Sequence, residues 1–246
     1  MKLHIIGSNS AGNSYILEGE TCSLIIECGL PLQDIKEALN FDMSKIAGAC
    51  VSHCHGDHAK YANQFMAAGI DVCASLGTLN TFKYPNTHRM RVLQKNKKYQ
   101  IGEFTVMPFD ITHDAPEPFG FLIKHSECGL VLFCTDTMYL KYKFPGLNQI
   151  IIEANYSQEL LDARLQEGDT IDLVRNRVIS SHMSLETCKD VLRANDTSMV
   201  HNIVLIHLSD GNSDARLFKS EVESLTGKTV TVADSGMKID FNINPF

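Results

Sequence analysis

The sequence predicts an α/β protein in which two β-sheets pack face to face, with helices on their outer sides. Three observations lead to this fold class. Short apolar runs typical of strands recur in both halves of the chain, helical patterns lie between and after them, and no internal repeat or flexible linker divides the 246 residues. This alternation suits a four-layer αββα sandwich. We therefore expect residues 1–246 to form a single domain.

The first third of the chain is predicted to hold four strands and one helix. Strands are expected at residues 2–6, 14–18, 23–27 and 46–52. A small-residue loop at 7–13 separates the first two, and residues 31–39 carry a helical pattern. The last of these strands is small, apolar and β-branched. It leads directly into a cluster of histidine and aspartate.

The rest of the chain is predicted to mix strands and helices. A helix at 59–68 ends at Gly69, a residue suited to a helix C-terminus, and Ser184 suits the N-cap of a later helix. Further helices are expected at residues 157–166, 185–194 and 214–225. Further strands are expected at residues 71–74, 104–109, 119–124, 130–134, 149–153, 202–206, 229–232 and 237–241.

Composition points to a soluble protein that is not broadly basic. Hydrophobic residues make up 44% and charged residues 21%, which is ordinary for a globular core and surface. The net charge of −7 weakens the case for a polynucleotide-binding surface, although a local basic patch can coexist with an acidic total. Residues 89–98 are rich in arginine and lysine. They form either a solvated face or such a nucleic-acid contact patch.

The expected location is the cytoplasm, with no membrane partner. The apolar run at the N-terminus is too short for a signal peptide, and no later stretch reaches the length of a membrane span. The eight cysteines are scattered and form no CxxC pair, which favours reduced thiols over a disulfide framework.

The segment from His53 to His58 carries the chemistry. It places three histidines and one aspartate within six residues, out of ten histidines in the whole chain, so a chance polar loop is a poor explanation. Side chains alternate in an extended chain, so His53 and His55 point the same way and can hold one metal. Asp57 and His58 can serve a second metal. Nitrogen and oxygen ligands suit zinc, manganese or iron(II), and Cys54 should point away.

Two metal sites need more ligands than this segment offers. Three residues that directly follow apolar strands qualify: His113, Asp136 and His207. Singly, each is more typical of a hydrogen-bonded loop residue. Together with the cluster they make the set that two metals need, with Asp136 as the bridging carboxylate.

This pattern, His-x-His-x-Asp-His followed by separated His, Asp and His, resembles the signature of the metallo-β-lactamase superfamily over nearly the full length. The resemblance implies the metallo-β-lactamase fold and two divalent metal ions, Zn or Mn. It implies that the first ion is held by His53, His55 and His113. It implies that the second is held by Asp57, His58 and His207, with Asp136 between them.

A narrower resemblance is to the YycJ-like (WalJ) branch, which is associated with exonuclease activity on DNA. It rests on the segments 7–13, 52–58, 112–118, 135–137, 153–156, 181–184 and 207–209. Tyr156 and Ser181 stand where that branch is expected to have His and Gly, and neither is a predicted ligand.

The catalytic residues we predict are Asp57, Glu153 and His182. A water that bridges two cations loses its proton near neutral pH and the resulting hydroxide attacks phosphorus. The leaving oxygen then needs a proton. A comparable Glu and His act together in the transfer-RNA 3′-processing enzymes of the superfamily. That likeness implies that Glu153 orients His182 as general acid; the alternative is a purely structural pair. No organic cofactor site is expected.

The predicted function is a dinuclear-metal-dependent phosphodiesterase, a nuclease of the 5′-3′ exonuclease kind, acting on nucleic acid. The acidic net charge favours an alternative that hydrolyses cyclic or other small nucleotides. A thioester or lactone hydrolase of the same fold would not need Glu153 and His182. A non-enzymatic binding module is disfavoured because all seven ligand positions are filled. β-Lactam hydrolysis is disfavoured because no cysteine ligand is evident. The oligomeric state is open and includes a homodimer.

Overall fold

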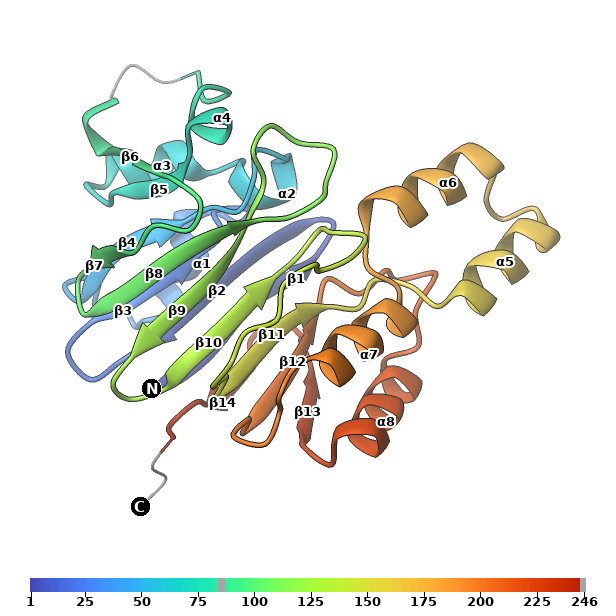
Figure 1. Cartoon of the computed structure of the whole chain (residues 1–246). Coiled ribbons are helices and arrows are strands. Elements are labelled where there is room, and N and C mark those ends of the chain that lie inside the picture. Colours follow the sequence, from blue (N-terminus) through green and yellow to red (C-terminus); the bar gives the residue numbers. More distant parts are fainter. Residues whose placement is uncertain (84–86, 244–246) are drawn as a thin grey trace.

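Two seven-stranded sheets lie face to face in the computed structural model, which describes residues 1–83 and 87–243 (Figure 1). In the first sheet the strands run in the order β14 (Lys238–Asp240), β1 (Lys2–Asn9), β2 (Gly12–Glu18), β3 (Ser23–Ile26), β4 (Ile46–Cys50), β5 (Val72–Ser75), β6 (Met90–Leu93). In the second they run β13 (Thr229–Val232), β12 (Asn202–Ile206), β11 (Gln149–Glu153), β10 (Gly129–Cys134), β9 (Phe119–His125), β8 (Phe104–Asp110), β7 (Tyr99–Ile101).

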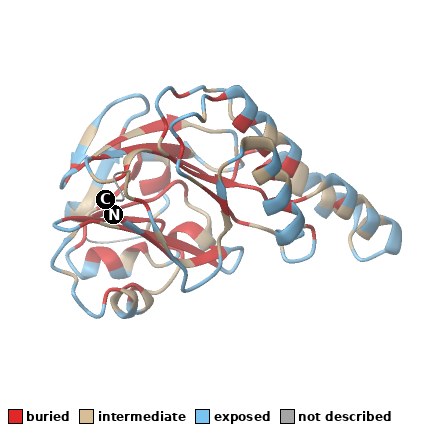
Figure 2. Ribbon diagram, turned by 90° about the horizontal axis from the view of Figure 1, so that it is seen from below, coloured by how far each residue is buried: buried red, intermediate tan, exposed pale blue. Residues whose placement is uncertain are grey.

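Helices cover the outer side of each sheet, which confirms the predicted αββα sandwich (Figure 1). On the first sheet lie α1 (Leu32–Ala38) and α3 (Ala62–Ala67), and on the second lie α7 (Leu185–Ala194) and α8 (Ala215–Thr226). The remaining helices are α2 (Gly56–Ala59), α4 (Leu76–Leu79), α5 (Gln158–Glu167), α6 (Asp172–Ser181) and a 3-10 turn at Thr87–Arg89. Helices α5 and α6 form an arm that projects from the sandwich and is largely exposed (Figure 2).

Buried apolar side chains pack on both faces of each sheet. In β11, Ile151 packs into the layer between the sheets, whereas Ile150 and Ile152 pack under α7 and α8. Neighbouring residues of a strand point to opposite faces, so a strand covered on both sides needs an unbroken apolar run. This is why residues 149–153 were readable as a strand from sequence.

Parallel pairing gathers the functional segments at one edge. Strands β10, β11 and β12 are mutually parallel and in register, with Cys134 opposite Ile152 and Glu153 opposite Ile206. Strands β3, β4 and β5 are likewise parallel. Ligand sites in such sheets lie outside the carboxyl ends of the strands. The residues that follow these strands therefore meet in one place.

The prediction of a loop at residues 7–13 is wrong. Strand β1 continues to Asn9 and β2 begins at Gly12, so only two residues form the turn. The small residues serve close packing: a Cβ on Gly7 would lie 2.7 Å from Leu30 Cδ1, and one on Gly12 would lie 2.7 Å from Gly29 O. Glycine within a strand often marks such an approach.

The helix predicted at residues 59–68 is split. Residues Gly56–Ala59 form the one-turn helix α2 and α3 begins only at Ala62, while Gly69, at φ +88°, ends it as expected. Asp57 and His58 consequently project from a helical turn.

Sequence analysis missed helices α4 and α6, strands β6 and β7, and the 3-10 turn at Thr87–Arg89. Strand β6 lies inside the basic stretch 89–98. Both Arg89 and Arg91 form ion pairs with Asp71, at 3.1 and 2.8 Å, and Lys95 lies 3.9 Å from Asp110. Two neighbouring carboxylates, those of Asp71 and Asp110, thus offset part of the positive charge of this stretch. No helix in residues 1–83 or 87–243 has the length and apolar character to cross a membrane.

Candidate metal centre

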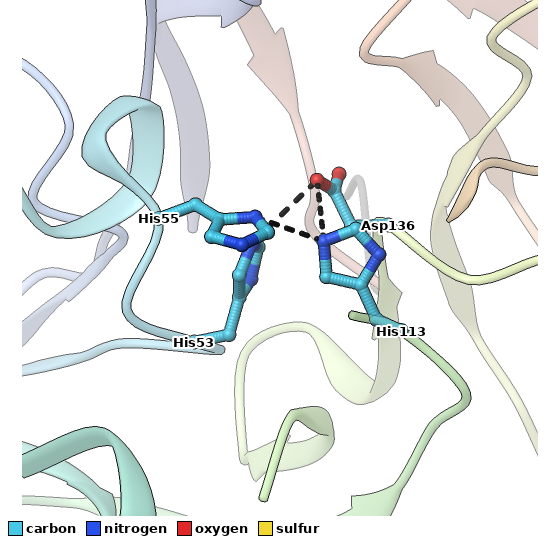
Figure 3. Close-up of side chains that lie close together, drawn as sticks. All are labelled: His53, His55, His113 and Asp136. Atoms are coloured by element: carbon cyan, nitrogen blue, oxygen red, sulfur yellow. Dashed lines mark hydrogen bonds and ion pairs between the residues drawn. The ribbon is translucent and has the colours of Figure 1, made fainter. Parts of the chain in front are cut away.

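All seven predicted ligands converge at the shared edge of the sheets. The structure brings these ligands together in two groups whose ligand atoms lie within 4.8 Å of one another, and a third such group joins Asp136 and His207 to Glu153 and His182. The first cluster contains His53, His55, His113 and Asp136, and the second contains Asp57, His58, Asp136 and His207. Figure 3 shows the first cluster, with the three imidazoles and the carboxylate turned toward one point. Asp136 belongs to both clusters, as the bridging position requires.

In the first cluster, the ligand nitrogen and oxygen atoms face one another at distances of 3.1 to 3.6 Å. Asp136 Oδ2 lies 3.6 Å from His53 Nε2 and 3.5 Å from His113 Nε2. His113 Nε2 lies 3.1 Å from His55 Nδ1. A gap lined by converging lone pairs is the arrangement that a cation fills.

The second cluster has the same character. His58 Nε2 lies 3.2 Å from Asp57 Oδ2 and 3.4 Å from Asp136 Oδ2. His207 Nε2 lies 3.1 Å from Asp57 Oδ2 and 3.7 Å from Asp136 Oδ1. The two carboxylates and two imidazoles therefore surround one point beside the first cluster.

The residues fit a divalent metal. His53 Nε2 is buried and has no hydrogen-bond partner among the described residues. Burial, together with the nearby His58, lowers the pKa of His53 well below its usual value, so its imidazole is neutral and offers a lone pair. Burial alone would raise the pKa of Asp136, but the positive charge that His207 and His58 carry when protonated holds it well below its usual value. The carboxylates in turn outweigh burial and raise the pKa of both imidazoles, so a metal that binds there would displace their protons. Neutral imidazoles and ionised carboxylates are the ligands of zinc and manganese.

Outer contacts orient the imidazoles of the first cluster. His53 Nδ1 lies 2.9 Å from Ser52 Oγ, and His113 Nδ1 lies 3.0 Å from the backbone oxygen of Ser181. Bonds of this kind fix which nitrogen faces the metal. Because a carbonyl makes the second contact, a serine at position 181 performs it as well as a glycine.

Glu27 is a site residue that sequence analysis missed. It follows β3, is fully buried, and its Oε1 lies 3.6 Å from His58 Nδ1. Its carboxylate also accepts a hydrogen bond from the backbone N–H of Ser52, the residue before His53. The available signal was its position: Glu27, like Glu153, ends an apolar strand with a charged side chain.

Three site residues at this edge have a strained backbone. Glu27, Asp136 and His207 have φ values of 69°, 48° and 56°, a region that residues other than glycine rarely adopt. Each follows a strand that ends at the site. Such strain persists at sites where the surrounding structure holds it in place.

Glu153 and His182 form a direct pair beside the clusters. His182 Nδ1 lies 2.7 Å from Glu153 Oε1, and the other carboxylate oxygen accepts hydrogen bonds from the backbone N–H groups of Thr137 and Met183, both at 3.1 Å. Glu153 Oε1 also lies 3.5 Å from His207 Nδ1. Burial lowers the pKa of His182, but the charge of Glu153 outweighs it and raises that pKa above its usual value.

A cleft of about 250 Å³ opens over the centre. It is lined by Ser10, His55, Asp57, His113, Asp114, Asp136, Arg177, Ser181, His182 and His207. Ser10 reaches it from the β1–β2 turn, whereas Asn13 is fully buried and its Nδ2 contacts Asp57 Oδ2 at 3.3 Å. Cys54 belongs to neither cluster, as predicted. Arg177, on the unpredicted helix α6, and Asp114 also line the cleft, and sequence analysis did not single out either as a site residue.

Two curated bacterial proteins are similar to this chain. It is 24% identical over 258 residues to a Streptococcus pneumoniae protein named exodeoxyribonuclease WalJ, and the alignment covers 98% of this chain and 93% of that protein. It is 23% identical over 249 residues to a Bacillus anthracis protein named exodeoxyribonuclease YycJ, which spans 92% and 89%. These similarities confirm the resemblance to the YycJ-like branch.

Solved structures agree on the fold. Zinc-bound PqqB from Methylobacterium extorquens is 12% identical, covers 98% of this chain with 100% of its own, and superposes with a TM-score of 0.73. Residues 26–208, which include all seven predicted ligands, match the sequence profile described as the beta-lactamase superfamily domain. The chain therefore belongs to the beta-lactamase superfamily, as a metal-dependent hydrolase with the metallo-β-lactamase fold.

Proposed function

We propose that the protein is a dinuclear-metal phosphodiesterase that degrades DNA from an end with 5′-3′ polarity. The observation that carries this proposal is the 2.7 Å contact between His182 Nδ1 and Glu153 Oε1 at the cleft. Cleavage of a phosphodiester leaves an oxygen that needs a proton, and an imidazole held beside the phosphate can donate it. The relatives named exodeoxyribonuclease support DNA as the substrate.

Each cluster has a role in this proposal. Two divalent ions, zinc or manganese, when bound there, supply positive charge that activates water and polarises the phosphate. His53, His55 and His113 would hold one ion, Asp57, His58 and His207 would hold the other, and Asp136 would contact both.

The remaining residues handle the proton. Glu153 is anchored by two backbone N–H groups, so its carboxylate cannot turn away from His182. With Nδ1 engaged, His182 presents its Nε2 to the cleft, where it protonates the leaving oxygen. Asp57, which also lines the cleft, helps to hold the attacking oxygen in place.

Two other functions use the same fold. Hydrolysis of cyclic or other small nucleotides is favoured by the net charge of −7, because an acidic protein does not concentrate polynucleotide by charge alone. Hydrolysis of a thioester expels a thiolate, which leaves without a positioned proton donor, and a thioester or lactone hydrolase of this fold is not expected to need the pair of Glu153 and His182. Replacement of His182 separates this last class from the phosphodiesterases.

The test is an assay of purified protein reconstituted with zinc or with manganese. Substrates are 5′-labelled single-stranded DNA and RNA, a panel of cyclic nucleotides, and a thioester and a lactone. The control is Asp136→Ala, which removes the carboxylate shared by both clusters. We expect the wild type to release labelled mononucleotide from DNA, and the control to release none.

Other outcomes redirect the assignment. Turnover of cyclic nucleotides alone would assign the protein to small-nucleotide hydrolysis. Silence on every phosphodiester with two metals bound, together with thioester or lactone turnover, would contradict the proposed function.

A further inference from the structure

The cleft over the metal centre is too small to hold much of a nucleic acid. Its volume of about 250 Å³ lies below the roughly 300–1,000 Å³ typical of sites that enclose a small ligand. A polynucleotide must therefore continue outside it. A second groove of about 600 Å³ begins where the cleft ends, because both are lined by His113, Asp114, Arg177 and Ser181.

Helix α6 forms one wall of this groove. Leu173, Asn176, Arg177 and Ser180 all line it, and their spacing of three and four residues puts them on one helical face. Figure 1 shows α6 in the arm that projects beside the ends of the central strands. The face offers an apolar side chain, two hydrogen-bonding side chains and a guanidinium, which match the base, sugar and phosphate of a nucleotide.

Arg177 differs from the other two arginines of the arm. Arg164 donates a hydrogen bond to Asn212 at 3.1 Å, outside the arm, and Arg175 pairs with Asp162 at 2.7 Å, which links α6 to α5. Arg177 is exposed, and its guanidinium forms no ion pair with any residue in the described ranges. No carboxylate of α5 or α6 lines the groove.

The acidic side chain that does line the groove is directed elsewhere. Asp114 Oδ1 lies 3.3 Å from His113 Nε2 and 4.0 Å from His55 Nε2, toward the first cluster. The Arg177 charge is therefore left for an anion that enters from solvent. Guanidinium groups bind phosphate through paired hydrogen bonds.

We propose that this groove holds the nucleotide next to the scissile phosphodiester of a DNA strand, and that Arg177 binds its phosphate. The proposal rests on the proposed nuclease function and narrows the substrate to a polynucleotide. The C-terminal end of α6 then has two roles. The backbone oxygen of Ser181 orients His113, and Arg177, one turn earlier, positions the DNA strand.

The test compares Arg177→Ala and Arg177→Lys with Arg216→Ala. Arg216 is a matched control: it is exposed on α8 and lines neither the cleft nor the groove. One measurement is kcat/KM on single-stranded DNA of about 20 nucleotides, longer than the ~4–16 that single-strand sites commonly cover. The same variants are assayed on bis(p-nitrophenyl) phosphate, which is too short to reach the groove.

We expect Arg177→Ala to lower the ratio of kcat/KM for DNA to that for the small diester by about 10-fold or more, mainly through KM. Arg177→Lys should recover part of this loss because it restores the charge without the paired geometry. Arg216→Ala should match the wild type.

A second measurement does not depend on cleavage. Fluorescence anisotropy of the labelled DNA, titrated with metal-loaded protein in which His182 is replaced by alanine to slow cleavage, gives the slope of log K against log salt concentration. Loss of one phosphate contact reduces this slope by about 0.7 for single strands. We expect that change for Arg177→Ala in this background and none for Arg216→Ala.

Failure of this proposal is distinct from failure of the proposed function. A wild type that binds DNA without cutting it would contradict the nuclease, while the salt slope would still decide the role of Arg177. An Arg177→Ala variant with the wild-type substrate ratio and the wild-type salt slope would overturn the groove assignment. A protein that neither binds nor cuts DNA would overturn both.

Discussion

The imidazole of His182 is fixed against Glu153, with 2.7 Å between Nδ1 and Oε1. These residues are 29 positions apart in sequence and come from the end of α6 and the end of β11. Because the carboxylate is buried and also accepts two backbone N–H groups, it holds one ring orientation. A proton donor at the cleft needs such a fixed orientation to be ready before substrate arrives.

Replacing His182 by alanine should therefore reduce kcat on DNA by about 10²–10⁴-fold, the usual contribution of a general acid. The loss on bis(p-nitrophenyl) phosphate should be smaller, because p-nitrophenolate leaves without a proton. Bound metal, measured by plasma mass spectrometry, should stay at the wild-type level. Equal losses on both substrates would refute the role of His182 as proton donor.

Asp136 should be needed for both metal ions. Its carboxylate lies 3.4–3.7 Å from ligand nitrogens of both clusters, so Asp136→Ala should lower bound metal from about two ions per chain to below one. His55→Ala, which alters only the first cluster, should retain about one. Two ions retained by Asp136→Ala would show that the carboxylate does not bridge.

Removal of metal should destabilise the fold. Metal that binds only the native state adds stability, about 4 kcal/mol when its concentration is about 1,000 times Kd. Treatment with a chelator should lower the melting temperature by several degrees, and zinc or manganese should restore it. The Asp136→Ala protein is the control, since its melting temperature should respond little to either step.

Glu27→Gln should weaken the second metal site while keeping the fold. The amide can still accept the hydrogen bond from Ser52 N–H, but it removes the negative charge that faces His58 Nδ1. Loss of such an outer partner typically costs about 10–100-fold in metal affinity. Metal titration should show one weakened site and one unchanged site; two unchanged sites would show that Glu27 is only structural.

Cys54 should be the only thiol that reacts in the native protein. The other seven cysteines are buried, and burial raises the pKa of Cys128 and Cys188 to about 12. Labelling with a thiol reagent and peptide mapping should give one site when folded and eight when denatured. Cys54→Ser should keep both metals and activity, because its sulfur belongs to neither cluster; metal loss would make it a ligand.

The local sequence pattern was sufficient to predict an element where its residue types are compatible with only one structure. The apolar runs at 149–153 and 202–206 became β11 and β12 with the predicted bounds, because strands covered on both faces must be apolar throughout. Ser184 caps α7 by accepting a hydrogen bond from Thr187 N–H, as its position predicted. The glycines of 7–13 were misjudged, since glycine suits both a turn and a close approach to Leu30.

Helix α6 has no comparable pattern in the sequence. Its exposed Leu173 and Val174 give no apolar stripe, because the arm packs against little of the protein. Arg177 and the groove were consequently invisible in the sequence.

The sequence by itself determined the kind of site. The spacing of His53, His55, Asp57 and His58 brings metal ligands together through local geometry alone, and residues that directly follow apolar strands are expected to meet at a shared edge of the sheets. Only the tertiary structure decided which outer residues support the predicted ligands. Glu27, after β3, faces His58, and the backbone oxygen of Ser181, at the end of α6, orients His113. Such contacts depend on sheet order and register, which are fixed by packing across the whole chain.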